Sequence, residues 1–178
     1  MQRREFLIAI YPSAHYHFRM SEVSPIPEGY HSITPYFIVK GAAKAIDWYK
    51  ESFGAEELMR MPMGDKPGHA EMQIGTSRIM LADEMDEMNF KSPESYVGTP
   101  VGICFYTEDC NAVFNKAVAN GAKVVRPLAD QFYGDRSGTV FDPFGHQWTI
   151  STHIEDLTPE EMDKRMQKVG TECGNPRE

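Results

Sequence analysis

Hydrophobic and polar positions along the chain follow one pattern that occurs twice. Apolar runs at 34–39 and 99–106 each predict a strand, and each is followed by the three- to four-residue apolar spacing of an amphipathic helix. A Gly-Ala pair follows each helical stretch, and three short segments with strand-like alternation come next. The order strand, helix, three strands therefore repeats, and the pattern predicts an α+β fold built from two βαβββ modules.

Both predicted helices are amphipathic, so each is expected to lie on a sheet. The first ends at Gly54, which can adopt a left-handed conformation, and the second begins after Asp109, a residue type that caps helices. A third helix is expected after Thr158, because Thr-Pro-Glu-Glu is a capping box with proline at the first helical position. The apolar faces comprise Ala42, Ile46, Tyr49 and Phe53 in the first helix, and Cys110, Val113, Phe114, Ala117 and Val118 in the second.

The later strands of each module are bounded by turn residues. We expect them at Glu57–Met61, His69–Ile74, Arg78–Ala82, Lys123–Pro127, Ser137–Phe141 and Gln147–Ser151. The resulting division is a flexible N-terminal extension (1–29), a first module (30–84), a linker (85–98), a second module (99–156), and a C-terminal helix and tail (157–178).

Composition and charge narrow the class of protein. The formal net charge of −8 disfavours a nucleic-acid partner, and no apolar run is long enough to cross a membrane. The cysteines have no paired spacing, which favours the reducing cytoplasm. Arg3-Arg4 is faintly similar to an export signal, but the apolar stretch after it is cut at Pro12, and Met20 is the favoured natural start.

Three segments carry a family resemblance. DPFGHQW at 142–148, GDRSGTVF at 134–141 and ITPYFIVKGAAKAIDWYKESFGAEEL at 33–58 resemble the vicinal oxygen chelate superfamily of glyoxalase, bleomycin-resistance and dioxygenase proteins, and most of all its PhnB-like members. The resemblance implies two curved sheets around a cleft, with helices on the convex side, and a homodimer.

Strand alternation then divides each strand into a helix-facing and a cleft-facing set. The resulting cleft is polar, aromatic and thioether-rich, which suits an organic ligand of moderate polarity; a solvated sheet face would give the same alternation. His69 and Glu71 are candidate catalytic residues for proton transfer, although a simple hydrogen-bonded pair is the alternative. The candidate ligand-binding residues are Thr34, Tyr36, Gln73, Arg78, Met80, Cys104, Tyr106, Tyr133, Arg136 and Thr149. Arg136 is expected on a loop at the cleft mouth, where it could hold a carboxylate or phosphate of a ligand, and the alternative is an ion pair with Asp135.

The usual metal site is expected to be absent. Metal-using members of this superfamily place His, Gln or Glu at four equivalent points, and the resemblance puts Thr34, Met80, Gly102 and Thr149 at those points. None of these is a suitable ligand for a hard divalent ion. We therefore expect no cofactor, with Zn, Ni, Fe or Mn held by an altered ligand set as the alternative.

Two functions remain open. The first is a metal-independent small-molecule-binding protein similar to the bleomycin-resistance type. The second is an enzyme, either a metal-dependent lyase, isomerase or dioxygenase with altered ligands, or a cofactor-free catalyst of proton transfer.

Overall fold

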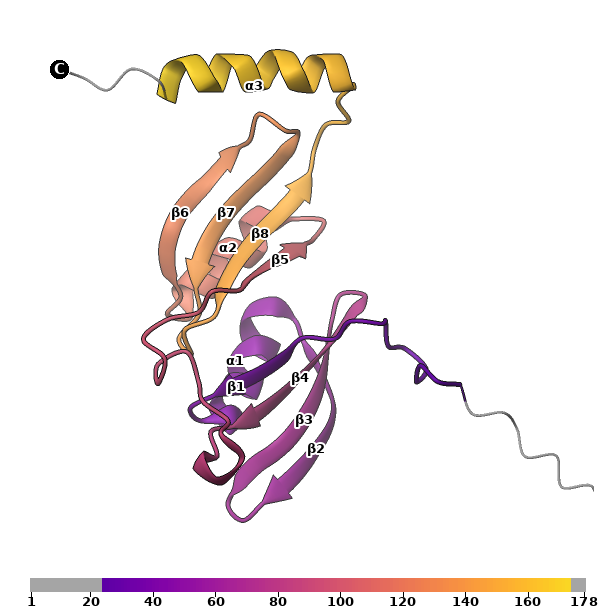
Figure 1. Ribbon diagram of the computed structural model, residues 1–178, viewed down its shortest axis with the longest axis vertical. Coiled ribbons are helices and arrows are strands. Elements are labelled where there is room, and N and C mark those ends of the chain that lie inside the picture. The colour runs from indigo at the N-terminus through magenta and orange to yellow at the C-terminus, as the bar shows by residue number, and fades with distance from the viewer. Residues whose placement is uncertain (1–23, 174–178) are drawn as a thin grey trace, which may run out of the picture.

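The computed structural model of the protein describes residues 24–173 (Figure 1). Most of the expected N-terminal extension, and the question of an export signal or a start at Met20, lie outside these residues. Among the described residues, no helix is long and apolar enough to cross a membrane.

The fold consists of two four-stranded mixed sheets, which confirms the predicted α+β class with two βαβββ modules. In each sheet the module's first strand lies at one edge and runs parallel to the last strand of the module, while the other pairs are antiparallel. The first sheet has the order β1-β4-β3-β2, with β1 at Tyr36–Val39, β2 at Glu56–Met63, β3 at Lys66–Ile74 and β4 at Ser77–Asp83. The second has the order β5-β8-β7-β6, with β5 at Gly102–Tyr106, β6 at Lys123–Asp130, β7 at Asp135–Phe141 and β8 at Gln147–His153.

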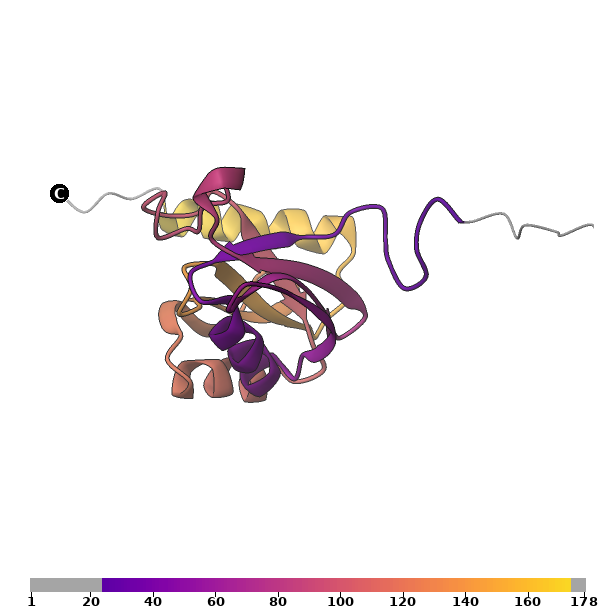
Figure 2. The same cartoon turned by 90° about the horizontal axis from the view of Figure 1, so that it is seen from below.

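Helices α1 (Ala42–Phe53) and α2 (Cys110–Ala119) contact each other and lie together on one side of the strands (Figure 2). The predicted helix ends are confirmed: Gly54 has φ 64°, and the Asp109 carboxylate accepts hydrogen bonds from two backbone N–H groups at the start of α2. The helices therefore bury their apolar faces against one face of each sheet and leave the opposite faces without a helix of the same module.

One hydrophobic core lies beneath both sheets. Phe53 of α1 packs edge-on against Trp148 of β8 at 4.7 Å between ring centroids, and Phe37 of β1 meets the same indole at 5.6 Å. The buried Asp142 carboxylate accepts hydrogen bonds from the Tyr49 hydroxyl at 2.8 Å and from the Trp148 indole N–H at 2.9 Å. The two modules are thus joined by a shared core and by a polar contact within it.

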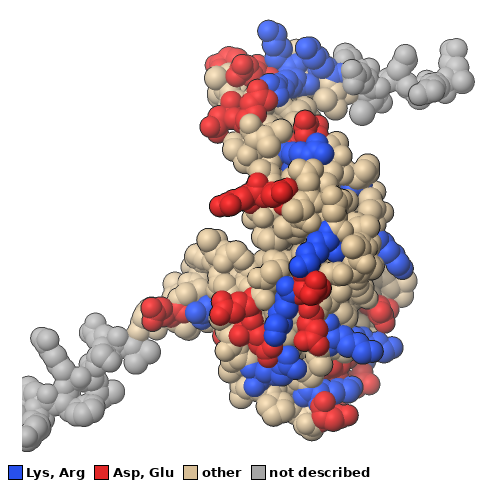
Figure 3. All heavy atoms as spheres, turned by 180° about the vertical axis from the view of Figure 1, so that it is seen from behind, with Lys and Arg blue, Asp and Glu red and all other residues tan. Residues whose placement is uncertain are grey.

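The remaining segments connect or extend the modules. The linker contains the short 3₁₀ helix η1 (Asp86–Met88). The later part of the linker is held against the end of the first module, because the Glu84 carboxylate accepts hydrogen bonds from Ser92 and Ser95. Helix α3 (Pro159–Cys173) begins with the expected capping box, since Thr158 and Glu161 exchange hydrogen bonds. On the face shown in Figure 3, acidic and basic side chains are interspersed rather than gathered by sign.

Candidate functional site

The open face of the first sheet brings together several of the predicted residues. Tyr36, Met80 and Glu71 are direct neighbours across β1, β4 and β3, and Arg78 lies opposite Gln73 in the adjacent row. Residues directly opposite each other in a sheet project to the same face. These five side chains therefore share the face that carries no helix of its module.

A chain of polar contacts crosses this face. The Tyr36 hydroxyl lies 3.0 Å from His69 Nδ1, and His69 Nε2 lies 3.5 Å from Glu71 Oε1. Burial raises the pKa of Tyr36, so this hydroxyl stays protonated at neutral pH and can be either donor or acceptor to the imidazole. The two candidate catalytic residues are therefore neighbours with a tyrosine on the far side of the imidazole.

The segment before β1 folds back over Arg78. The guanidinium lies 4.6 Å from the centre of the Tyr30 ring, and its Nε–H is buried without a hydrogen-bond partner among the described residues. A buried donor that lacks a partner costs free energy, and such groups often mark a place where a ligand or water binds. Arg78 is thus the charged group of this face with unused hydrogen-bonding capacity.

The open face of the second sheet is built from hydroxyl and thiol groups. Cys104, Thr149 and Thr139 lie opposite one another across β5, β8 and β7. The Thr139 hydroxyl is 3.1 Å from that of Thr149 and accepts hydrogen bonds from the Arg126 guanidinium at 3.0 and 3.2 Å. Tyr133 reaches the same face, with its hydroxyl 3.4 Å from Ser137 Oγ.

A carboxylate that the sequence analysis considered only as an ion-pair partner of Arg136 organises the next part of this face. Asp135 is 4% exposed, accepts a hydrogen bond from the Tyr106 hydroxyl at 2.6 Å, and lies 2.8 Å from His153 Nδ1. The hydrogen bond to Asp135, together with burial, raises the pKa of Tyr106 to about 12. Hydrogen bonds to Asp135 and Asp156 raise the pKa of His153. The predicted strand began at Ser137, and extending it by two residues to the observed start of β7 would have placed Asp135 on this face.

A cavity of about 290 Å³ lies where the two modules meet. It is lined by four of the ten predicted ligand-binding residues, Thr34, Arg78, Cys104 and Tyr106. Tyr36, Gln73 and Met80 lie on the first sheet and Thr149 on the second, while Tyr133 lies in the turn between β6 and β7 and contacts Ser137 of the second sheet. The structure therefore distributes these predicted residues over both open faces and the boundary between them.

Arg136 lies elsewhere than expected. It belongs to β7 rather than to a loop, and its guanidinium donates to Asn111 of α2 at 2.9 Å and to Asp130 at 2.7 Å. Alternation along β7 explains the difference, because Asp135 and Ser137 face the open side and Arg136 must face the helix side. Asp130, and not Asp135, is its ion-pair partner.

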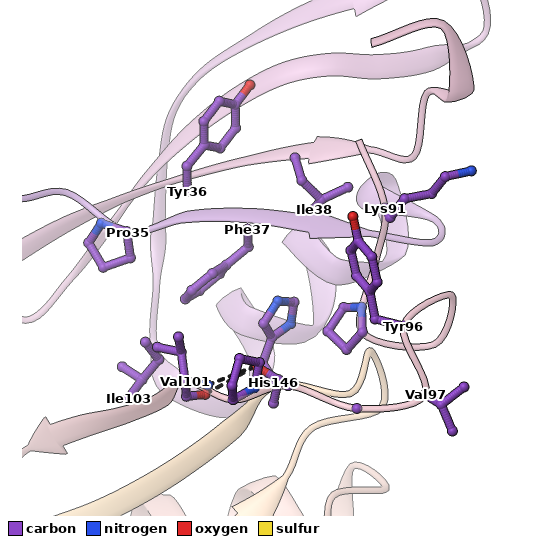
Figure 4. A pocket seen from close by; sticks show the side chains of 14 residues that line it. Pro35, Tyr36, Phe37, Ile38, Lys91, Tyr96, Val97, Val101, Ile103 and His146 are labelled. Atoms are coloured by element: carbon purple, nitrogen blue, oxygen red, sulfur yellow. Dashed lines mark hydrogen bonds between the residues drawn. The ribbon is translucent and has the colours of Figure 1, made fainter. Parts of the chain in front are cut away.

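A second and larger groove, of about 830 Å³, lies between β1 and the end of the linker (Figure 4). Its walls are mostly apolar, and the largely buried imidazole of His146 lies against Phe37 with 4.6 Å between ring centroids. Burial lowers the pKa of His146, although the Asp142 charge opposes this shift. The groove therefore presents a neutral imidazole among apolar side chains.

The residues at the expected metal positions do not fit a hard divalent ion. Thr34 and Thr149 offer only hydroxyl groups, Met80 offers a thioether, and Gly102 has no side chain. Divalent ions in proteins are bound mainly by carboxylate and imidazole groups. Within residues 24–173, no group of three or more His, Cys, Asp or Glu side chains is arranged to hold a metal ion.

Comparison with known proteins places these features in a family. The model of the Glyoxalase/Bleomycin resistance protein/Dioxygenase superfamily matches residues 29–150. The uncharacterized protein Rv0887c of Mycobacterium tuberculosis is 38% identical over 143 residues, which is 78% of this chain and 84% of that protein. Protein YjdN of Escherichia coli is 28% identical over 142 residues, 67% of this chain and 93% of its own length.

Solved structures share the fold. TioX from Micromonospora sp. ML1 superposes with a TM-score of 0.57 at 24% identity, over 68% of this chain and 98% of TioX. The PhnB protein from Bacillus cereus gives 0.55 at 18% identity over 68% and 99% of the two chains. The fosfomycin resistance protein FosX from Listeria monocytogenes, solved with Mn(II) and sulfate, gives 0.54 at 21% identity over 76% and 97%. The chain belongs to the glyoxalase/bleomycin resistance protein/dioxygenase superfamily.

Proposed function

We propose that the protein binds a small organic ligand of mixed polarity on its open sheet faces, without the divalent ion that some members of the superfamily hold. The observation that carries this proposal is the set of side chains gathered on the open face of the first sheet. Tyr36, His69 and Glu71 form a polar chain beside Met80, while Arg78 keeps an unused donor. Few, well-placed polar groups in an otherwise apolar and aromatic lining are typical of small-molecule sites.

The ligand class follows from Arg78. A guanidinium with an unsatisfied N–H favours a carboxylate or phosphate, and the neighbouring Tyr30 ring favours a flat group stacked beside it. The cavity of about 290 Å³ next to it has room for a small metabolite. We therefore expect an aromatic or amphipathic acid.

A second copy of the chain is expected to complete the site. Large side chains on the open faces are left in contact with solvent in one chain: Tyr36 is 42% exposed, Met61 54% and Tyr106 58%. Exposed aromatic and methionine side chains are enriched at protein interfaces. A homodimer that covers both faces would bury them, and light scattering on the purified protein measures its mass.

Thermal shift with a panel of aromatic carboxylates and their neutral amides tests ligand binding. A carboxylate present at about 100 times its Kd should raise Tm by roughly 5–10 °C in a chain of this size. Arg78→Met should abolish this shift, while the control Arg60→Met, which removes an arginine paired with Glu57 at the surface, should retain it. The absence of a shift with any compound would contradict the proposal, and stoichiometric Zn, Ni, Fe or Mn on elemental analysis would contradict its metal-free part.

Cofactor-free proton transfer is the second candidate, favoured by one contact. Glu71 lies within 3.5 Å of His69, so the pair can accept a proton from a bound substrate and pass it on. Once a ligand is identified, Glu71→Gln should abolish turnover while leaving the thermal shift unchanged. Equal turnover in the variant would remove this candidate.

The unpaired cysteines Cys104 and Cys110 agree with a cytoplasmic location, which we also propose.

A further inference from the structure

Two methionines and a histidine share the outer part of the first sheet's open face. In β2, Met59 lies directly opposite Glu71 and Met61 directly opposite His69. Residues two apart in a strand share a face, so both thioethers project to the side on which His69 contacts Tyr36. Met59 is 37% exposed and Met61 is 54% exposed, so both residues are in contact with solvent.

We infer that Met59, Met61 and His69 form a site for a soft monovalent metal ion, Cu(I) or its redox-inert analogue Ag(I). Thioethers are neutral, polarizable ligands that select Cu(I) over hard divalent ions, and imidazole binds copper as well. Directly opposed residues have Cβ atoms about 4.5–5.5 Å apart, so the flexible methionine side chains can bring their sulfur atoms to the imidazole. This inference concerns a different ligand from the proposed organic acid and does not rest on it.

The surroundings of His69 suit a metal-binding imidazole. Nδ1 lies 3.0 Å from the Tyr36 hydroxyl, so in the metal-bound form its N–H can donate to that oxygen while Nε2 is the ligand. The Glu71 carboxylate, 3.5 Å from Nε2, supplies negative charge near the cation. Met80, opposite Glu71 on the next strand, is available as a further thioether.

Titration of the purified full chain with Cu(I), under anaerobic reducing conditions and against a chromophoric Cu(I) chelator, tests the site. We expect one ion per chain. The double variant Met59→Leu/Met61→Leu and the single variant His69→Gln should each weaken binding by about 10- to 100-fold or more, as the loss of a ligand should exceed the usual effect of a surrounding residue. The control Met166→Leu, on the exposed part of α3, should bind as the wild type does. No binding, or equal binding by the double variant, would overturn the inference.

A measurement on the wild-type chain avoids any question of variant folding. Hydrogen peroxide converts accessible methionines to sulfoxides, and a bound ion should protect its own ligands. With Ag(I) present, mass spectrometry should show slower oxidation at Met59 and Met61 and unchanged oxidation at Met166. Equal rates with and without Ag(I) at Met59 and Met61 would mean that these methionines serve only as an adaptable apolar surface.

Discussion

The Asp142 carboxylate joins the two modules, and removing one of its hydrogen-bond donors should weaken the whole fold. Its side chain is fully buried and accepts hydrogen bonds from the Tyr49 hydroxyl, the Trp148 indole and the backbone N–H groups of Phe144 and His146, at 2.8–2.9 Å. Tyr49 belongs to the first module and the other three donors to the second. Burial and the Asp142 charge raise the pKa of Tyr49, so its hydroxyl remains a donor.

The substitution Tyr49→Phe removes one of these hydrogen bonds and keeps the ring. Hydrogen bonds to charged groups contribute about 1.5–3 kcal/mol to stability, so we expect a loss in that range, equivalent to a Tm lower by roughly 3–12 °C. Asp142→Asn should cost more, about 3–5 kcal/mol, because an amide has one acceptor oxygen and its NH₂ group would face buried donors. Tyr96→Phe is the control, since Tyr96 is 65% exposed and its loss should change stability by no more than about 0.5 kcal/mol.

Urea unfolding followed by circular dichroism measures these differences, with all variants at the same protein concentration so that they are compared under the same conditions for any dimer equilibrium. A loss below about 0.5 kcal/mol for Tyr49→Phe would refute the argument that this contact joins the modules. An unfolding free energy of Asp142→Asn equal to that of the wild type would refute the same argument.

Two further changes test the packing and the electrostatics. A Cβ at Gly138 would lie 2.5 Å from Phe114, whereas one at Gly102 would have nothing nearer than 3.8 Å, so Gly138→Ala should destabilise by about 1–3 kcal/mol and Gly102→Ala by about 0.5 kcal/mol or less in the same urea assay. The raised pKa of His153 means that its pairing with Asp135 stabilises the fold below about pH 6.5 and that this stabilisation is lost as pH rises through the folded pKa. The difference in unfolding free energy between wild type and His153→Gln should therefore be largest near about pH 5.5 and smallest near about pH 8.5, and a constant difference would contradict the assignment.

The fold could be predicted from the sequence because its signals are local and repeated. The spacing of Ala42, Ile46, Tyr49 and Phe53 specifies the buried face of α1, and all four side chains are buried. Gly54 ends the helix with a positive φ, as a left-handed stop requires. Strand ends were less accurate: β1 begins at Tyr36 rather than at Thr34, because Pro35 has no N–H to give to a sheet.

The contacts within the candidate site depend on distances that the sequence does not encode locally. Alternation correctly placed Thr149 on the open face, opposite Cys104, but it gave no sign that Asp135 would accept a hydrogen bond from Tyr106, a residue 29 positions earlier. It likewise could not show that Arg136 would pair with Asp130 across the β6–β7 hairpin. Such pairings are set by the curvature of the strands and the packing of the sheets, both of which are properties of the tertiary structure.

The difference between the two faces of each sheet links stability to function. On the helix side, Trp148 is 2% exposed and contributes to the core, while on the open side Tyr106 is 58% exposed. If a second copy and a ligand together cover the open faces, the two binding events share the same side chains and are thermodynamically linked. Ligand affinity should then rise with protein concentration, and the ligand should strengthen dimerisation by the same factor. Ligand binding that is independent of protein concentration across the dimer dissociation range would place the whole site within one chain, at the cavity between the modules.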